Sequence, residues 1–156
     1  MPNSPDDKVA AVNRKARHDY EILETMECGL VLTGTEIKSI RAGRANLKDG
    51  YAKFKDGELW LENVHISPYE KATAWVKVEP HRARKLLLHR RELRRLQAKV
   101  KERGFTLVPL KLYVKGGKLA KIELGLARGK SAADRRDDIR ERDVQRSIAR
   151  ELRNRN

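Results

Sequence analysis

Two runs of alternating apolar residues face each other across a pair of glycines in the second half of the chain. Residues 105–114 and 118–127 flank Gly116-Gly117. A period of two is typical of strands with one buried face, and paired glycines tolerate the positive φ angles of a tight hairpin turn. We therefore predict an antiparallel hairpin whose apolar face comprises Val108, Leu110, Leu112, Val114, Ala120, Ile122, Leu124 and Leu126. The opposite face, which is free to meet a ligand, carries Lys111, Tyr113, Lys121 and Glu123.

Further strands are predicted upstream of this hairpin. Residues 20–32 are rich in β-compatible residues, residues 51–55 and 58–66 flank the turn dipeptide Asp56-Gly57, and residues 85–88 form a brief apolar run. Five or six strands with helices between them are compatible with a small closed or partly closed β-barrel. The pattern alone does not separate a barrel from another α+β sheet. Pro109 cannot donate to a strand ladder and therefore indicates an edge or a bulge.

Two helices are expected between the strands. Residues 35–42 change to a helical period and are followed by Gly43. Residues 90–103 have an apolar stripe at i, i+3 and i+7, formed by Leu93, Leu96 and Val100. Gly104 marks the end of this helix, whereas His89 is a weak residue with which to cap its start.

The positive charge of the chain is concentrated in one segment. The 156 residues contain 36 Lys and Arg against 22 Asp and Glu, a net charge of +14. Residues 79–103 alone hold ten basic and three acidic side chains, so half of the net charge lies there. A solvated helix face is the plain interpretation, but so large a local excess favours binding to phosphates, because each neutralised phosphate releases counterions.

The two ends of the chain differ in composition from the middle. Residues 128–156 have few large apolar side chains, so we predict a basic tail that is disordered when free and becomes helical on its partner. Residues 1–12 are expected to be disordered, residues 13–127 to form the barrel domain, and residues 67–80 to make a long mobile connection. Neither an export signal nor a membrane span is indicated, and a single cysteine is typical of a reducing cytoplasm.

The sequence contains no recognisable catalytic or metal-binding pattern. The four histidines lack metal-ligand spacing, and Gly129-Lys130-Ser131 lacks the upstream glycine of a phosphate-binding loop. Cys28 has no basic flank and is expected to pack as a small apolar residue. We therefore predict a binding protein that is not an enzyme and needs no cofactor or metal.

Several motifs are similar to those of one protein family. The chain resembles the family of small protein B, the bacterial SsrA-binding or transfer-messenger-RNA-binding protein, from about residue 13 to 143. The motifs are NRKARHDYEI (13–22), ECGLVLTGTEIKSIRAGRANLKDGYA (27–52), HISPY (65–69), RKLLLHRREL (84–93), LVPLKLYVKGG (107–117) and ARGKSAADRRDDIRERD (127–143).

This resemblance implies a mainly β fold with inserted helices: an oligonucleotide-binding-type small β-barrel with a basic C-terminal tail. It also implies a part in trans-translation, in which the protein binds the transfer-RNA-like domain and takes the place of the missing anticodon arm. The RNA is delivered to stalled ribosomes, where the nascent chain is tagged. Implied partners are transfer-messenger RNA and the ribosome, whose small-subunit rRNA lines the empty message channel. Elongation factor Tu and alanyl-tRNA synthetase are implied indirectly, through the RNA.

The family's RNA-contact positions fall on Asn13, Glu27 and Leu87. On the residues alone, Asn13 is equally suited to cap a helix or turn, Glu27 to be an exposed strand acid and Leu87 to be a core residue. Side chains expected to share the RNA contact are Arg14, Lys15, Arg17, His18, Lys38, Arg41, Arg44, Arg84 and Lys85.

In the tail, the resemblance implies that a short polar segment reaches the decoding centre. Its members are Lys130, Asp134, Arg135 and Arg136, with Arg135 where the family has lysine, and Ala133 stands where the family often has Tyr or His. An arginine can make bidentate contacts that a lysine cannot. A structural ribosomal protein is the alternative class, since a basic barrel and an arginine-rich tail suit it equally. A hydrolytic RNA enzyme would need an acid cluster that the sequence does not contain.

Overall fold

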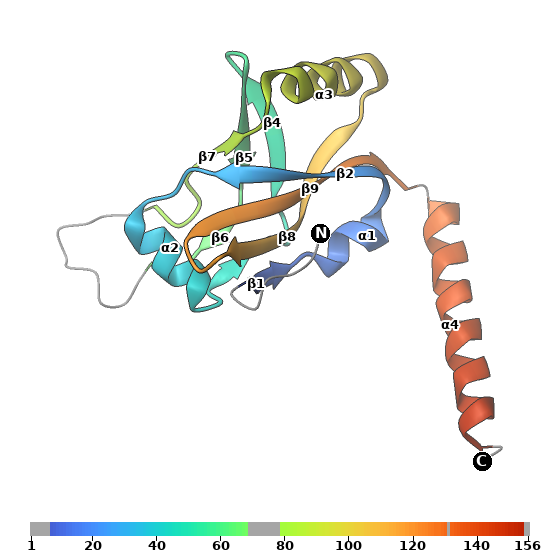
Figure 1. Cartoon of the computed structure of the whole chain (residues 1–156). Coiled ribbons are helices and arrows are strands. Elements are labelled where there is room, and N and C mark those ends of the chain that lie inside the picture. Colours follow the sequence, from blue (N-terminus) through green and yellow to red (C-terminus); the bar gives the residue numbers. More distant parts are fainter. Residues whose placement is uncertain (1–6, 69–78, 131, 155–156) are drawn as a thin grey trace.

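Six antiparallel strands close into a barrel at the centre of the molecule (Figure 1). The structure is a computed structural model that describes residues 7–68, 79–130 and 132–154. The strand order is β8-β4-β5-β7-β2-β9, and β9 pairs back with β8 to close the ring. The strands are β2 (Tyr20–Leu30), β4 (Tyr51–Lys55), β5 (Glu58–Glu62), β7 (Arg84–Leu87), β8 (Thr106–Lys115) and β9 (Leu119–Gly129). This confirms the predicted small β-barrel, and the two predicted hairpins are β4–β5 and β8–β9.

A seventh strand, β1 (Lys8–Val12), corrects the prediction of a disordered N-terminus over these five residues, and residues 1–6 lie outside the described part. It pairs with the far half of β8, from Lys111 to Val114. The same edge of β8 is shared by two strands. Strand β4 pairs with its first part, at Ala52 and Leu107, and β1 pairs with its second part. An unpaired strand edge exposes a row of N–H and C=O groups, and β1 satisfies them here.

The predicted strand over residues 58–66 is broken at Asn63. Strand β5 ends at Glu62, Asn63 has a positive φ of 56°, and residues His65–Ile66 form a separate short strand, β6. Strand β6 pairs with β3 (Ala45–Asn46) in a second, two-stranded sheet. Asparagine is among the few residues that adopt a positive φ readily, so the chain turns here and leaves the barrel.

Four helices are attached to this barrel: α1 (Arg14–Asp19), α2 (Gly34–Arg41), α3 (Arg90–Arg103) and α4 (Ala132–Asn154). Helix α2 begins at a capping box in which Thr33 accepts from the backbone N–H of Glu36 and Glu36 accepts from that of Thr33. Helix α3 has the predicted bounds and ends at Gly104, whose φ is 66°. As expected, His89 makes no capping hydrogen bond at the start of α3.

The core is built from aliphatic side chains, and no aromatic residue of the described part of the chain is fully buried. The apolar face of β8 is divided between two clusters, contrary to the single face predicted. Leu112 and Val114 pack inside the barrel, whereas Val108 and Leu110 pack with Ala16 of α1. A register shift between Pro109 and Lys111, the bulge that Pro109 indicated, reverses the alternation between these two halves.

Helix α3 is held on the barrel by its predicted apolar stripe, of which Leu93 and Val100 are partly buried against the core, and by one carboxylate. Leu96 is fully buried. The Glu24 carboxylate of β2 accepts from Arg95 Nη2 at 2.6 Å and from Lys99 Nζ at 2.9 Å. These two hydrogen bonds lower the pKa of Glu24 to about 2. The clamp therefore depends on Glu24 being ionised.

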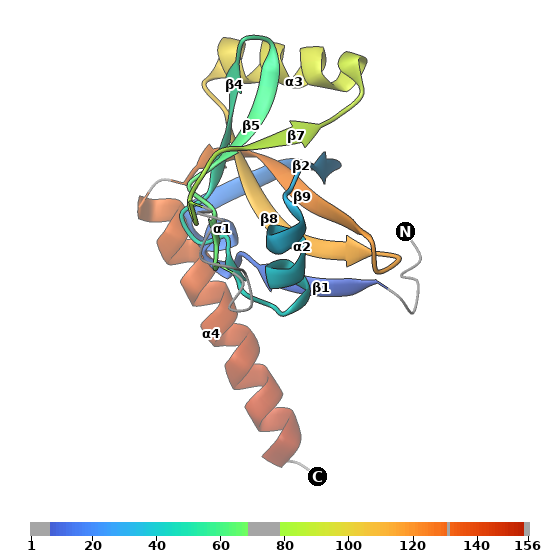
Figure 2. The same cartoon turned by 90° about the vertical axis from the view of Figure 1, so that its left-hand side faces the viewer.

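The tail forms helix α4, which extends away from the barrel (Figures 1 and 2). Its apolar residues Val144, Ile148 and Leu152 are more than half exposed, so the barrel does not bury them. The structure gives the helical form of the tail, and the disorder of the free tail stays a prediction. Of the predicted long connection over residues 67–80, the part from 69 to 78 lies outside the described residues.

Gly50 offers a steric test of this packing. An added Cβ at Gly50 would lie 2.5 Å from Val64 Cγ2 and 3.0 Å from Pro109 Cγ, whereas one at Gly129 would meet nothing within 4 Å. We expect Gly50→Ala to lower the free energy of unfolding by about 1–3 kcal/mol, as overpacking does, and Gly129→Ala to change it by less than about 0.5 kcal/mol. Urea denaturation of both variants measures this, and equal effects would contradict the packing described.

The Glu24 clamp predicts a pH dependence of stability. Because the folded-state pKa of Glu24, about 2, lies below the unfolded value, its stabilisation is present above about pH 4.5 and is lost as the pH falls toward 2. Glu24→Gln should therefore flatten the decline of the unfolding free energy in this window. Urea denaturation at several pH values measures the slope, and Glu102→Gln, an exposed carboxylate on α3, is the charge-matched control. Parallel curves for the wild type and Glu24→Gln would contradict the clamp.

Candidate nucleic-acid interface

The outward-facing side chains of β2, β9 and β8 share one face of the barrel. In β2, Met26, Cys28 and Leu30 are buried, so the residues between them point outward. Glu27 of β2 is paired with Glu123 of β9, which in turn is paired with Lys111 of β8. The predicted ligand-facing residues Lys111, Tyr113, Lys121 and Glu123 therefore come together around Glu27.

These strands and β1 line a groove of about 440 Å³ on that face. Its lining consists of Asp7, Lys8, Val9, Thr25, Met26, Glu27, Lys111, Tyr113, Lys115 and Glu123. The Glu27 carboxylate lies 3.8 Å from Lys115 Nζ and 4.0 Å from Lys121 Nζ. Burial and a hydrogen bond to Glu27 raise the pKa of Tyr113, so its hydroxyl stays protonated. Carboxylate acceptors beside ammonium and phenol donors suit the bases, riboses and phosphates of RNA.

Leu87 lies beside Glu27 on the same outer surface. Strand β7 is paired with β2 so that Leu87 is opposite Gly29, two residues beyond Glu27. Leu87 is 50% exposed, which excludes the core alternative. A Cβ on Gly29 would lie 3.2 Å from Leu87 Cβ, so the glycine lets the leucine lie close over the strand. Leu87 thus adds an apolar contact to a polar surface.

Helix α1 brings Arg17 to the edge of this groove and carries further cations beside it. Arg17 Nη2 lies 3.9 Å from Glu123 Oε1, and Arg14 is exposed. Lys15 pairs with Asp49 at 3.8 Å, and His18 Nδ1 lies 3.0 Å from Asp19. These pairs are exposed or half-buried, so each contributes little to stability and leaves the side chain available to a phosphate.

Asn13 has a structural role instead of the direct RNA contact expected. It is only 5% exposed, and its side chain accepts from Ala16 N at 3.2 Å as the cap of α1. Its Nδ2 donates to Leu47 O at 3.1 Å and to Pro109 O at 2.9 Å. Because all its polar atoms are bonded within the protein, Asn13 positions α1 and with it the cations of that helix.

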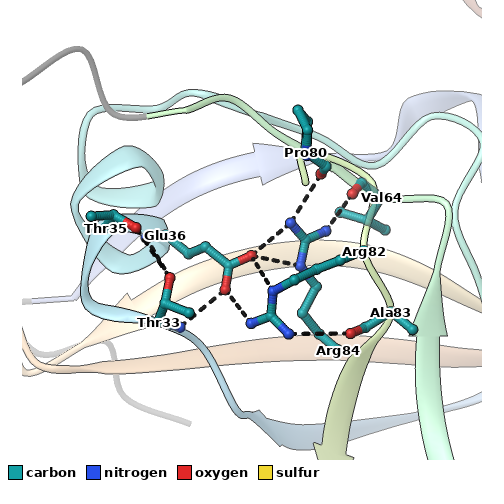
Figure 3. A network of polar contacts seen from close by, with 8 residues as sticks. All are labelled: Thr33, Thr35, Glu36, Val64, Pro80, Arg82, Ala83 and Arg84. Carbon is teal, nitrogen blue, oxygen red and sulfur yellow. Dashed lines mark hydrogen bonds and ion pairs between the residues drawn. The ribbon is translucent and has the colours of Figure 1, made fainter. Parts of the chain in front are cut away.

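Arg84 is the clearest correction among the predicted contacts. It is fully buried, so it does not reach an RNA phosphate. Figure 3 shows its guanidinium between Glu36 of α2 and two backbone carbonyls. Nε donates to Glu36 Oε2 at 2.8 Å, Nη1 to Val64 O at 2.6 Å and Nη2 to Pro80 O at 2.9 Å. Arg84 and Lys85 are neighbouring cations in the sequence. Nothing in the sequence indicates that Arg84 points into the protein while Lys85 points outward.

Glu36 is the centre of this network and was missed by the sequence analysis. Burial by itself raises the pKa of Glu36, but hydrogen bonds from Arg82, the Thr33 backbone and Arg84 outweigh it and lower the net value. Glu36 therefore stays ionised and joins α2 to Arg82 and to Arg84, the first residue of β7. The Thr33-x-x-Glu36 spacing is a signal for a capping box, but nothing local indicates the two arginines 46 and 48 residues away.

The remaining predicted cations lie on the exterior. Lys38, Arg41 and Arg44 are exposed on or just after α2, and Lys8, which lines the groove, donates to Arg41 O at 2.8 Å. Lys85 is half-buried and pairs with Glu58 at 2.9 Å. In the tail, Lys130 Nζ donates to Arg17 O at 3.1 Å, which ties the start of the tail to α1. Asp134, Arg135 and Arg136 belong to α4, but their side chains lie outside the described part.

Cys28 is a core residue, as expected. It is fully buried, and burial raises the pKa of its thiol to about 12. Within residues 7–68, 79–130 and 132–154, His, Cys, Asp and Glu side chains nowhere gather in the threes that a metal ion needs. Over the same ranges, every helix is too short or too polar to span a bilayer.

A small closed barrel with a cationic exterior and a mixed polar groove defines a nucleic-acid-binding module. The family model described as SmpB protein matches residues 10–154, and the chain belongs to this family. The resemblance seen in the sequence is thereby confirmed.

Relatives and a solved structure agree with this assignment. An SsrA-binding protein of Streptococcus sanguinis is 56% identical over 147 residues, covering 94% of each chain. One from Roseiflexus is 57% identical over 149 residues, covering 96% of this chain and 94% of the relative. A chain from a structure described as "tmRNA-SmpB: a journey to the center of the bacterial ribosome" is 58% identical, with a TM-score of 0.66, over 80% of this chain and 85% of that chain.

The neighbouring residues Arg84 and Lys85 provide a matched test of the buried network. Arg84→Met keeps most of the side-chain volume but removes the buried guanidinium, so we expect the unfolding free energy to fall by about 3 kcal/mol. Lys85→Met breaks a half-exposed ion pair and should cost less than about 1 kcal/mol. Chemical denaturation measures both, and a similar loss in the two variants would contradict the assigned role of Arg84.

Proposed function

We propose that this chain binds transfer-messenger RNA through its transfer-RNA-like domain and acts in trans-translation as a binding protein without chemistry of its own. Membership of the SmpB family supports this, as do relatives named for binding SsrA and a structural neighbour described with transfer-messenger RNA and the ribosome. The observation that carries the proposal is the groove around Glu27, where carboxylate, phenol and ammonium groups lie together beside the exposed Leu87.

In this proposal the groove recognises RNA by more than charge. Glu27 accepts from base or ribose donors, Tyr113 donates, and Leu87 packs against a sugar or base. Phosphates around it are contacted by Arg14, Lys15, Arg17, His18 and Lys85, and by Lys38, Arg41 and Arg44 on or just after α2. Asn13 and Arg84 hold α1, α2 and β7 in place and do not themselves touch the RNA.

The barrel takes the place of the anticodon arm that this RNA lacks, and the tail enters the empty message channel near the decoding centre. The outward direction of α4 from the barrel supports this division (Figure 2). Lys130, Asp134, Arg135 and Arg136 act at the ribosome in this proposal. Elongation factor Tu and alanyl-tRNA synthetase act on the same RNA and meet this chain through it, and the process takes place in the cytoplasm.

Glu27→Ala should weaken binding to the transfer-RNA-like domain about tenfold or more, because a hydrogen bond to a charged group is worth about 1.5–3 kcal/mol. Glu21→Ala is the matched control, since Glu21 is also exposed on β2 but pairs with Arg128 outside the groove. Filter binding measures the affinities. Equal weakening by the two substitutions would contradict recognition in the groove.

The tail should be separable from RNA binding. Arg135→Ala combined with Arg136→Ala is expected to leave affinity for the transfer-RNA-like domain unchanged and to abolish peptide tagging on stalled ribosomes. A tagging assay beside filter binding measures both. If the tail variant loses RNA affinity as severely as Glu27→Ala, the proposed division of labour is wrong.

A further inference from the structure

Helix α3 carries a row of cations that the protein itself does not neutralise. Arg90, Arg94 and Lys101 are exposed, and among the described residues none forms an ion pair or hydrogen bond with their side chains. Positions i, i+4 and i+11 fall within a narrow arc of a helix, and Gln97 lies between them. We call Arg90, Arg94, Gln97 and Lys101 the α3 ridge; it is about 16 Å long at 1.5 Å per residue.

On the other flank of the same helix, the cations are paired with carboxylates of the protein. Arg95 and Lys99 are bound by the Glu24 carboxylate at 2.6 and 2.9 Å, and Arg95 also pairs with Glu92 at 2.7 Å. Leu96 is buried beneath the helix. These contacts prevent α3 from rotating about its own axis, so the α3 ridge stays directed to solvent.

The α3 ridge is unfavourable for the protein alone. Arg90 and Arg94 are four residues apart, a spacing at which like charges destabilise a helix by about 0.2–0.5 kcal/mol. Arg90 is also the first residue of α3, where the helix dipole disfavours a cation. A row of cations that lowers the stability of its own helix indicates an anionic partner.

The residue types in α3 indicate whether the anionic partner is single-stranded or double-helical. The sequence of α3, RRELRRLQAKVKER, contains no aromatic residue, so the helix lacks the aromatic side chains on which proteins that bind single strands stack successive bases. A rigid straight row of cations instead suits the regular phosphate backbone of a double helix, which proteins recognise by shape and charge.

The position of α3 in the fold indicates which RNA the α3 ridge meets. In both views α3 and the tail helix α4 lie at opposite ends of the molecule (Figures 1 and 2). If the tail occupies the message channel, helix α3 lies at the end of the molecule away from the tail. We propose that the α3 ridge binds the phosphate backbone of a double-helical part of transfer-messenger RNA, as a contact surface separate from the Glu27 groove; this rests on the proposed function.

The first test uses the salt dependence of binding. Arg90→Gln, Arg94→Gln and Lys101→Gln are combined in the full chain, and affinity for whole transfer-messenger RNA is measured by fluorescence anisotropy over a range of KCl concentrations. Loss of three phosphate contacts should make the slope of log K against log salt shallower by about 2 to 3, and should weaken binding roughly tenfold or more. The charge-preserving combination Arg90→Lys, Arg94→Lys and Lys101→Arg should retain the wild-type slope.

Two further measurements exclude a general charge effect and a loss of structure. Lys48→Gln, Lys55→Gln and Lys118→Gln remove the same charge from exposed positions outside α3 and should change the slope much less. The thermal midpoint of the ridge variant without RNA should stay equal to that of the wild type or rise, because repulsion within α3 is relieved. An unchanged salt slope, or an equal change in the scattered-lysine variant, would overturn the proposal.

The second test locates the RNA. Cys28 is fully buried, so a cysteine introduced at Gln97 can be labelled selectively with a hydroxyl-radical probe. Cleavage of bound transfer-messenger RNA should fall in a double-helical part, and a probe on Ser147 of α4 should not produce the same cuts. Absent cleavage, or cleavage confined to single-stranded loops, contradicts the proposal.

These outcomes are distinguishable from a failure of the proposed function. If the wild type does not prefer transfer-messenger RNA over an unrelated structured RNA, the proposed function fails. If the wild type shows that preference, Glu27→Ala reduces it and the ridge variant behaves as the wild type, only the α3 ridge proposal fails.

Discussion

Strand β9 is the constraint on which the rest of the structure depends, because it pairs with β2 on one edge and with β8 on the other. This double pairing closes the barrel and places the outward side chains of three strands on one surface. Glu27 is far from Tyr113 and Glu123 in the sequence, yet the three residues line one groove. A shift of one residue in either ladder would turn these polar groups into the core, so the hydrophobic pattern that builds the barrel also sets the geometry of the groove.

The Glu36 network connects the helices to this barrel at an energetic cost. Taking a carboxylate and a guanidinium out of water is unfavourable, and only a well-formed set of hydrogen bonds offsets it. Arg84 meets that condition with three donors to Glu36, Val64 and Pro80 (Figure 3). The network thereby fixes α2, with its exposed cations, against the start of β7 and the residues just before it. Asn13 does the same for α1 with neutral hydrogen bonds.

The basic side chains of the protein thus fall into two groups, according to whether a carboxylate of the protein binds them. Arg84, Arg95 and Lys99 are bound by carboxylates of the protein and position its elements. Others, among them Arg14, Arg90, Arg94 and Lys101, are exposed without such partners among the described residues, so RNA phosphates can reach them without breaking an ion pair of the protein. Counting basic residues in a segment does not distinguish these kinds, which is why residues 79–103 contain both a buried structural arginine and the α3 ridge.

The sequence by itself determined the two hairpins, the bounds of α3, an edge or bulge at Pro109, the burial of Cys28 and the family, because each depends on residues close together in the chain or on their order. Tertiary structure alone decided the pairing of β1 with β8, the end of β5 at Asn63, the inward direction of Arg84 and the hydrogen bonds from Asn13 to Leu47 and Pro109. It also decided that Leu87 is exposed beside Gly29. These features depend on which strand edge or carboxylate from another part of the sequence lies within a few ångströms in space. Local residue patterns do not indicate which parts of the chain come together.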